Sequence, residues 1–342
     1  MRTIDWDDAK SCITIIDQTA LPARLVMLDI RDPASLMEAI SSLRVRGAPA
    51  LGAAGGFGVA LLTRTVPPTA LSNFVIELKA GSELLKKTRP TAVNLAWGVE
   101  RVLGKALTGR DLEEIAVRAL QEAKALAEED VAGCRAIGGH GAKLLDDGDT
   151  VLTHCNAGRL ACVDWGTALG VVRSAVAVGK KISVITCETR PLNQGSRITA
   201  WELAEDKIPV ALISDGMAGH IMRKGMVNSV IVGADRIVED AVFNKIGTYT
   251  LSVLAKSHKI PFYVAAPLST FDFTRKAQDV TIEQRNPEEL RRCGDRLLAP
   301  VGIPILNPAF DATPMENVTA IITESGVFRP PVDFAALEKQ AL

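Results

Sequence analysis

The second half of the chain contains five short hydrophobic runs that have the length of buried strands. Each run is followed by a polar or glycine-containing loop and then by apolar positions with helical spacing. Continuous apolar strands that alternate with helices are typical of a parallel sheet covered on both faces. Because such crossovers are right-handed, the pattern predicts a doubly wound parallel-sheet α/β domain. The predicted strands are residues 150–154, 182–186, 210–214, 229–233 and 261–265.

The first part of the chain is dominated by helical spacing instead. A short apolar run at residues 25–29 predicts a strand, and residues 33–40 begin an amphipathic helical pattern. Residues 111–145 are rich in Ala, Leu and Glu and predict one long helix. We therefore predict a mostly helical N-terminal domain at residues 1–145, which includes this connecting helix, and the α/β domain at residues 146–342.

The composition is that of an ordinary globular chain and excludes several classes of protein. With 342 residues, of which 47% are hydrophobic and 23% charged, the chain can bury a large core, so disorder, collagen and coiled coil are excluded as its main state. The formal net charge of −1 argues against a general nucleic-acid or membrane-surface binder. The six widely spaced cysteines are typical of reduced thiols, and no signal peptide or membrane span is visible, so we expect a cytoplasmic protein.

Two residues that follow predicted strands are candidates for catalysis, because ligands of open parallel sheets bind beyond the carboxyl ends of the strands. Cys155 follows the first strand, and we expect a helix to begin there, whose N-terminus would stabilise a thiolate. The alternative is a buried structural thiol, which is our interpretation of the similarly placed Cys187.

Asp235 follows the fourth strand, and a carboxyl group in a closed pocket there can act as an acid. A helix cap or a salt bridge to Arg236 would explain Asp235 equally well. Asp215 follows the third strand and could cap a helix that begins near Met217.

The glycine-rich segment 47–58 has a spacing that is superficially like that of a dinucleotide-binding loop. No apolar strand precedes it, so we interpret it as a closely packed helix of small residues rather than as a nicotinamide site. Arg46, Gly47 and Ala48 could offer a guanidinium and backbone N–H groups to an anion. The chain has no P-loop, and its four histidines form no zinc motif. Further loop clusters, which suggest a small phosphorylated and hydroxylated ligand, contain Arg89, Gln194, Asn244 and Lys245.

Six segments carry a resemblance to a known family, at residues 46–50, 153–158, 188–191, 194–203, 233–237 and 244–249. Among them are Arg-Gly-Ala-Pro-Ala, Thr-His-Cys-Asn-Ala-Gly and Gly-Ala-Asp-Arg-Ile. They resemble the methylthioribose-1-phosphate isomerases, a family related to the regulatory subunits of translation initiation factor 2B and to archaeal ribose-1,5-bisphosphate isomerase. The motifs follow one another in the family's order.

The resemblance implies a homodimeric aldose–ketose isomerase of methionine salvage that uses no metal and no organic cofactor. It would convert 5-methylthioribose 1-phosphate to 5-methylthioribulose 1-phosphate. The implied fold is a small, mostly helical N-terminal domain with a short sheet, followed by a Rossmann-like domain. By motif position, Cys155 and Asp235 match the catalytic pair. The residues that match substrate-binding positions are Arg46, Gly47, Ala48, Arg89, Gln194, Asn244 and Lys245.

One segment departs from the family pattern and leaves the substrate open. Between Asp235 and Asn244 the chain has no glycine, and Phe243 stands where family members more often carry a small residue. A 5-deoxyribose 1-phosphate isomerase of the same mechanism is therefore an alternative. A non-catalytic regulatory subunit is a further one, which the presence of both Cys155 and Asp235 disfavours. Ribose 1,5-bisphosphate would call for another cationic cluster.

Overall fold

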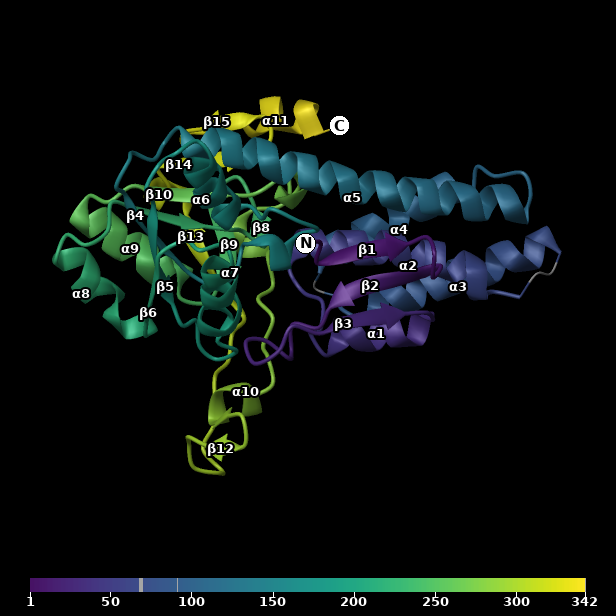
Figure 1. Cartoon of the computed structure of the whole chain (residues 1–342), viewed down its shortest axis with the longest axis horizontal. Coiled ribbons are helices and arrows are strands. Elements are labelled where there is room, and N and C mark those ends of the chain that lie inside the picture. Colours follow the sequence, from purple (N-terminus) through teal and green to yellow (C-terminus); the bar gives the residue numbers. More distant parts are fainter. Residues whose placement is uncertain (68–69, 91, 342) are drawn as a thin grey trace. The chain divides into compact units, whose positions relative to one another are not determined.

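The computed structural model describes residues 1–67, 70–90 and 92–341, and its chain divides into two compact units (Figure 1). Unit 1 comprises Met1–Cys134 and Arg159–Gly166, and unit 2 comprises Arg135–Gly158 and Thr167–Leu342. The long helix α5 (Leu112–Ala142) contributes residues to both. None of the helices in the described ranges combines the length and the apolar character that crossing a membrane requires.

Unit 1 contains a short antiparallel sheet and a group of helices. The sheet has the order β1-β2-β3, in which only β3 (Met27–Ile30) coincides with a predicted strand. The sequence pattern missed β1 (Ile4–Asp7) and β2 (Cys12–Ile16), because β1 alternates apolar with acidic residues over only four positions. The helices before α5 are α1 (Pro33–Ser41), α2 (Ala48–Thr65), α3 (Leu71–Lys87) and α4 (Val93–Ala106).

Helix α2 is the glycine-rich segment, and the structure confirms that its small residues serve close packing. Every residue from Ala50 to Thr63 is buried. A Cβ atom on Gly98 of α4 would lie 2.1 Å from the backbone oxygen of Gly52, and one on Gly55 would lie 2.6 Å from the oxygen of Leu95. The backbones of α2 and α4 therefore approach more closely than side chains would allow.

Unit 2 is built on a seven-stranded sheet of order β15-β14-β10-β7-β4-β5-β6. All neighbours are parallel except β15, which pairs antiparallel with β14. The predicted strands are confirmed as β4 (Thr150–Thr153), β5 (Ser183–Cys187), β6 (Val210–Ile213), β7 (Ser229–Val232) and β10 (Phe262–Ala265). The strands β14 (Ala320–Thr323) and β15 (Gly326–Phe328) were not predicted.

The sheet of unit 2 is covered on both faces, as a doubly wound domain requires. Alternate residues of β7 enter different hydrophobic clusters, since Val230 and Val232 pack in one and Ile231 in the other. The chain moves from β4 outward to β5 and β6, and then returns to β7 on the other side of β4. This reversal between β4 and β7 is the topological switch point at which ligands of such folds bind.

Smaller elements complete unit 2. The helices include α6 (Ala168–Ala177), α7 (Ala200–Glu205), α8 (Ala218–Arg223), α9 (Thr248–His258), α10 (Glu288–Arg291) and α11 (Phe334–Ala341). A second sheet has the order β13-β9-β8, and its strands are β8 (Arg236–Ile237), β9 (Ala241–Lys245) and β13 (Phe310–Pro314). A two-stranded hairpin is formed by β11 (Arg292–Cys293) and β12 (Arg296–Leu297).

Candidate active site

Both residues of the predicted catalytic pair follow strands that flank the switch point. Cys155 comes after β4 and Asp235 after β7, and these two strands pair in parallel. The loops that leave them are packed tightly, because a Cβ atom on Gly233 would lie 2.6 Å from the Cβ atom of Ala157. The fold therefore brings both loops to the same edge of the sheet.

Cys155 is not at the start of a helix, so that expectation is wrong. The next α-helix, α6, begins only at Ala168. Cys155 instead has a φ of +62°, in the left-handed region that a non-glycine residue seldom adopts. Its N–H donates to Thr189 Oγ1 at 2.8 Å, and its carbonyl oxygen accepts from Thr199 Oγ1 at 2.6 Å. Hydrogen bonds from neighbouring loops, rather than a helix dipole, fix this residue.

The residues after Cys155 are held by a buried carboxylate. Asn156 Nδ2 donates to Glu202 Oε1 at 2.9 Å, and Glu202 forms an ion pair of 2.8 Å with Arg173. A Cβ atom on Gly158 would lie 2.4 Å from Glu202 Oε2. These contacts explain why the loop carries asparagine and glycine at these two positions.

Asp235 is half-buried and lies between two strands. Its N–H donates to the carbonyl oxygen of Phe243 at 2.9 Å, which closes the β8–β9 hairpin. Because β8 begins at the next residue, the helix-cap interpretation of Asp235 is wrong. Arg236 forms an ion pair of 3.4 Å with Asp272. The Asp235 side chain is therefore carried at the base of a hairpin that begins at the switch point.

Gln194 lies after β5, at the start of the helical segment Gly195–Thr199, and offers a buried polar atom. The residue is 6% exposed, and its Oε1 atom has no hydrogen-bond partner among the described residues. The following Gly195 is required by packing, since a Cβ atom there would lie 1.7 Å from the carbonyl oxygen of Cys187. A buried acceptor of this kind is suited to a donor such as a sugar hydroxyl.

Asn244 and Lys245 end strand β9 and are linked to the catalytic loop through the backbone. Asn244 Nδ2 donates to Thr248 Oγ1 at 3.1 Å, and Lys245 Nζ donates to the carbonyl oxygen of Ala309 at 3.0 Å. The next carbonyl oxygen, that of Ile246, lies 2.8 Å from His154 Nε2. His154, which precedes Cys155, is therefore hydrogen-bonded to Ile246, which follows Lys245.

Asp311 on β13 holds the backbone that follows Lys245. It was not identified from the sequence. Its carboxylate accepts the N–H groups of Gly247 and Tyr249 at 2.7 and 3.0 Å, at the start of α9. Burial raises the pKa of Asp311 to about 6. Only its sequence-distant pairing with β9 brings this residue to the site, so no local signal could have revealed it.

Unit 1 carries the other four candidate residues. Arg46 is buried, and its Nε donates to Gln18 Oε1 at 3.1 Å. Gly47, with a φ of +96°, precedes the first residue of α2, Ala48, and a Cβ atom at this glycine would lie 2.4 Å from the Cα atom of Ala161. The start of this 18-residue helix can therefore present N–H groups and a guanidinium to an anion. Arg89 lies in the loop between α3 and α4.

Two groups of side chains in the described residues have a composition that could hold a metal ion. In unit 2, the ligand atoms of His154, Cys187 and Asp215 lie within 4.8 Å of one another. Burial lowers the pKa of His154 and raises the pKa of the Cys187 thiol to about 12. Cys187 is fully buried, in agreement with its interpretation as a structural thiol.

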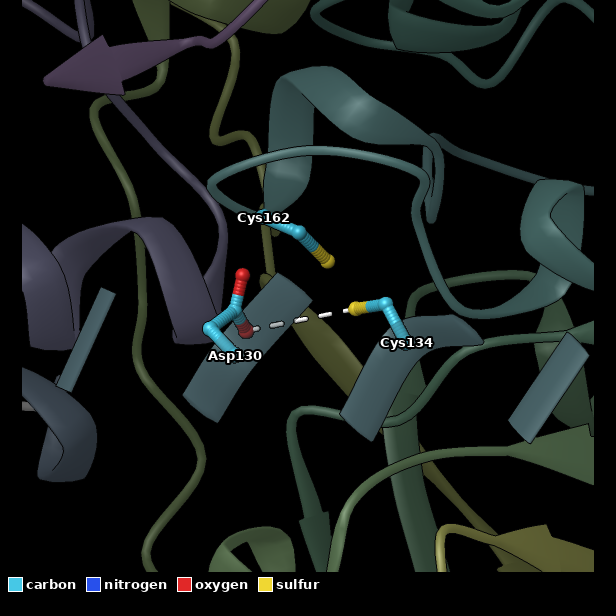
Figure 2. A group of neighbouring side chains, drawn as sticks. All are labelled: Asp130, Cys134 and Cys162. Atoms are coloured by element: carbon cyan, nitrogen blue, oxygen red, sulfur yellow. Dashed lines mark hydrogen bonds between the residues drawn. The ribbon is translucent and has the colours of Figure 1, made fainter. Parts of the chain in front are cut away.

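The second group lies in unit 1 and is drawn in Figure 2. Asp130 and Cys134 project from neighbouring turns of α5 toward Cys162, with 4.0 Å between Cys134 Sγ and Asp130 Oδ1. A hydrogen bond with Cys162 and burial raise the pKa of Cys134 well above its ordinary value. Each group offers three ligands, whereas a structural zinc site has four, and we assign neither as a metal centre.

Comparison with known proteins decides the family. The Initiation factor 2 subunit family matches residues 44–330. The chain belongs to this family. A methylthioribose-1-phosphate isomerase of Syntrophotalea carbinolica is 52% identical to this family member over 333 residues, which cover 96% of each chain.

Solved structures agree with this assignment. The 5-methylthioribose 1-phosphate isomerase of Pyrococcus horikoshii is 42% identical, with a TM-score of 0.90 over 99% of this chain and 95% of that chain. A structure described as translation initiation factor eIF-2B, subunit delta, from A. fulgidus is 60% identical, with a TM-score of 0.89 over 97% of this chain and 96% of that one. The resemblance and the fold class that the sequence motifs predicted are confirmed.

Proposed function

We propose that this family member is an aldose–ketose isomerase of methionine salvage, which converts 5-methylthioribose 1-phosphate to 5-methylthioribulose 1-phosphate. The observation that carries the proposal is the position of Cys155 and Asp235, each within three residues of the end of one of the two strands that flank the switch point. The names of the relatives from Syntrophotalea and Pyrococcus support the same activity. Strain at a non-glycine residue such as Cys155 is itself typical of functional sites.

The reaction requires an acid and a group that assists the transfer of hydrogen between C2 and C1 of the sugar. The phosphate on O1 prevents simple opening of the sugar to an aldehyde, so the C1–O4 bond must break while the ring oxygen gains a proton. In the proposed mechanism Asp235 supplies that proton. Hydrogen then moves from C2 to C1 by one of two routes. A hydride shifts while the O2 hydroxyl loses its proton, or a base removes the C2 proton to give an enolate-like intermediate and C1 then gains a proton. Cys155 accepts a proton or, as a thiolate, stabilises positive charge at C1.

The remaining candidate residues bind the substrate in this proposal. Arg46, Arg89 and Lys245 balance the charge of the phosphate, together with the N–H groups at Gly47 and Ala48. Gln194 and Asn244 hydrogen-bond sugar hydroxyls. The buried Oε1 atom of Gln194, which has no hydrogen-bond partner in the described part of the chain, supports its part in this assignment.

Phe243, the departure from the family pattern, is explained by packing. It is 4% exposed and packs in a hydrophobic cluster with Val238 and Ala241. Successive side chains of a strand point to opposite faces, so Phe243 and Asn244 project on opposite sides of β9. The methylthio substrate therefore remains the first choice over its 5-deoxy analogue.

The proposal is tested by comparing the two substrates with chelator-treated protein. We expect conversion of 5-methylthioribose 1-phosphate without added metal, with kcat/KM at least about tenfold above that for 5-deoxyribose 1-phosphate, because a pocket that accepts the larger substituent gains binding from it. Product formation is followed by NMR. Preference for the 5-deoxy substrate would favour the alternative isomerase. A folded protein that converts neither would favour a non-catalytic regulatory subunit.

The resemblance also supports a homodimer and a cytoplasmic location, which we include in the proposal. The six cysteines all lie in the described part of the chain and form no disulfide there, in keeping with a reducing compartment.

A further inference from the structure

From the contacts of the catalytic loop we infer that Thr189 is a positioning residue, which holds Cys155 for the proposed isomerisation, and that Asp215 holds Thr189 in turn. This inference rests on the proposed function for its catalytic meaning. The claim that Thr189 and Asp215 hold the Cys155 backbone in place depends only on hydrogen bonds and backbone conformations within unit 2. Neither residue is among the predicted site residues.

Cys155 has both of its backbone polar groups bound by threonine hydroxyls. Its N–H donates to Thr189 Oγ1 and its carbonyl oxygen accepts from Thr199 Oγ1, at 2.8 and 2.6 Å. Both threonines are fully buried. A left-handed cysteine persists only where its surroundings over-determine it, and these two hydroxyls do so.

Thr189 itself has an unfavourable conformation that needs support. Its φ is +65°, which is a genuine outlier for a β-branched residue. Its hydroxyl donates to the carbonyl oxygen of Cys187 at 3.1 Å, so the oxygen's lone pairs face the N–H of Cys155. The hydroxyl is therefore oriented before it accepts the hydrogen bond from Cys155.

Asp215 supplies the support from the neighbouring strand. The N–H groups of Thr189 and Arg190 donate to its two carboxylate oxygens, each at 2.8 Å. The expected helix-capping role of Asp215 is thus replaced by a contact with the loop after β5. The carboxylate holds two successive N–H groups, and a chain of hydrogen bonds runs from the end of β6 through Thr189 to Cys155.

The same loop also fixes Gln194. A Cβ atom on Gly195 would lie 2.9 Å from Thr189 Oγ1 as well as 1.7 Å from the carbonyl oxygen of Cys187. The backbone that carries Gln194 therefore packs directly on the Thr189 hydroxyl. Thr189 therefore contacts the backbone of Cys155, a proposed catalytic residue, and the backbone next to Gln194, a proposed substrate-binding residue. A threonine that only filled the core would contact neither.

The test compares Thr189→Val with Thr189→Ser in full-length protein. Valine keeps the shape and removes the hydroxyl, whereas serine keeps the hydroxyl. We expect Thr189→Val to lower kcat by about 10- to 100-fold, because a small misplacement of a reacting group has effects of that size. KM should change much less than kcat, because the backbone that carries Gln194 still packs against the carbonyl oxygen of Cys187. Thr189→Ser should retain most of the wild-type kcat.

A second measurement reads the position of Cys155 without any substrate. In a Cys293→Ser background, which removes an exposed thiol, the rate of iodoacetamide alkylation at Cys155 is followed by peptide mass spectrometry. We expect faster alkylation of Cys155 in Thr189→Val than in Thr189→Ser, because release of the loop exposes the thiol. Cys187 at the end of β5 should stay unlabelled, which excludes a general opening of the sheet.

The outcomes separate the two proposals. Wild-type kcat and wild-type alkylation in Thr189→Val would overturn the positioning role. An inactive wild-type protein whose Cys155 alkylation still responds to Thr189→Val would overturn the function and leave the positioning role standing. If Thr189→Val does not fold, Asp215→Asn takes its place, with a smaller effect in the same direction because one acceptor oxygen remains.

Discussion

At the scale of single residues, Asp130 shows how one buried carboxyl group makes stability depend on pH. Its Oδ2 atom accepts the N–H of Val163 at 2.7 Å, and burial raises the pKa of Asp130 to about 7. The folded chain therefore binds a proton at pH values where the unfolded chain has lost it. The stability that this group contributes is present below about pH 4 and is lost as the pH rises to about 7.

We predict that Asp130→Asn flattens the pH dependence of the free energy of unfolding between about pH 4 and 7. Asparagine keeps an oxygen for the N–H of Val163 and removes the titration. Urea unfolding followed by tryptophan fluorescence at several pH values measures the effect. Glu77→Gln on the exposed surface of α3 is the control. An unchanged slope in Asp130→Asn would contradict the raised pKa.

The positions of Cys155 and Asp235 after predicted parallel strands made them candidates, and the family resemblance then implied that they form the catalytic pair. Thr189 and Asp215 were not recognised as supports for Cys155. Thr189 follows β5 and Asp215 follows β6, but the hydrogen bonds that join them to the loop after β4 depend on side chains meeting across neighbouring strands. Local patterns carry no signal for such contacts.

At the scale of elements, the packing of α2 against α4 depends on glycines whose roles differ along one helix. Gly98 of α4 faces the backbone of Gly52, whereas a Cβ atom on Gly104 of the same helix would meet no other element within 4 Å in the described ranges. The two positions lie in the same helix, so they separate the effect of packing from that of helix propensity.

We expect Gly98→Ala to destabilise unit 1 by about 2 kcal/mol or more, because the new methyl group meets backbone that cannot move aside. Gly104→Ala should instead stabilise it by up to about 1 kcal/mol, since alanine is the better helix former. Thermal unfolding of both variants measures the difference. Equal effects of the two substitutions would contradict the close approach of α2 and α4.

The sequence predicted apolar runs that are followed by helical spacing. It missed β14, which is fully buried like β7 but continues into the antiparallel strand β15 instead of a helix. The long helix and five of the seven strands of the large sheet were found. Strands β8 and β9 were missed because a hairpin of two and five residues has no clear period. The eight residues Arg159–Gly166 group with unit 1 only through tertiary contacts, which a boundary placed near residue 145 could not foresee.

At the scale of the whole molecule, the chain provides no net field for an anionic substrate, because its formal net charge is −1. Recognition of a sugar phosphate must then depend on local groups. The candidate cations Arg46 and Arg89 belong to unit 1, and Lys245 belongs to unit 2.

The most direct test of this account is the turnover of 5-methylthioribose 1-phosphate by Cys155→Ser, Asp235→Asn and the double variant, each checked for folding. We predict that each single substitution lowers kcat by about 100-fold or more. The double variant should lie close to the worse single one, because groups that act together are not additive. Folded single variants that keep near-wild-type kcat would contradict the assignment of this pair.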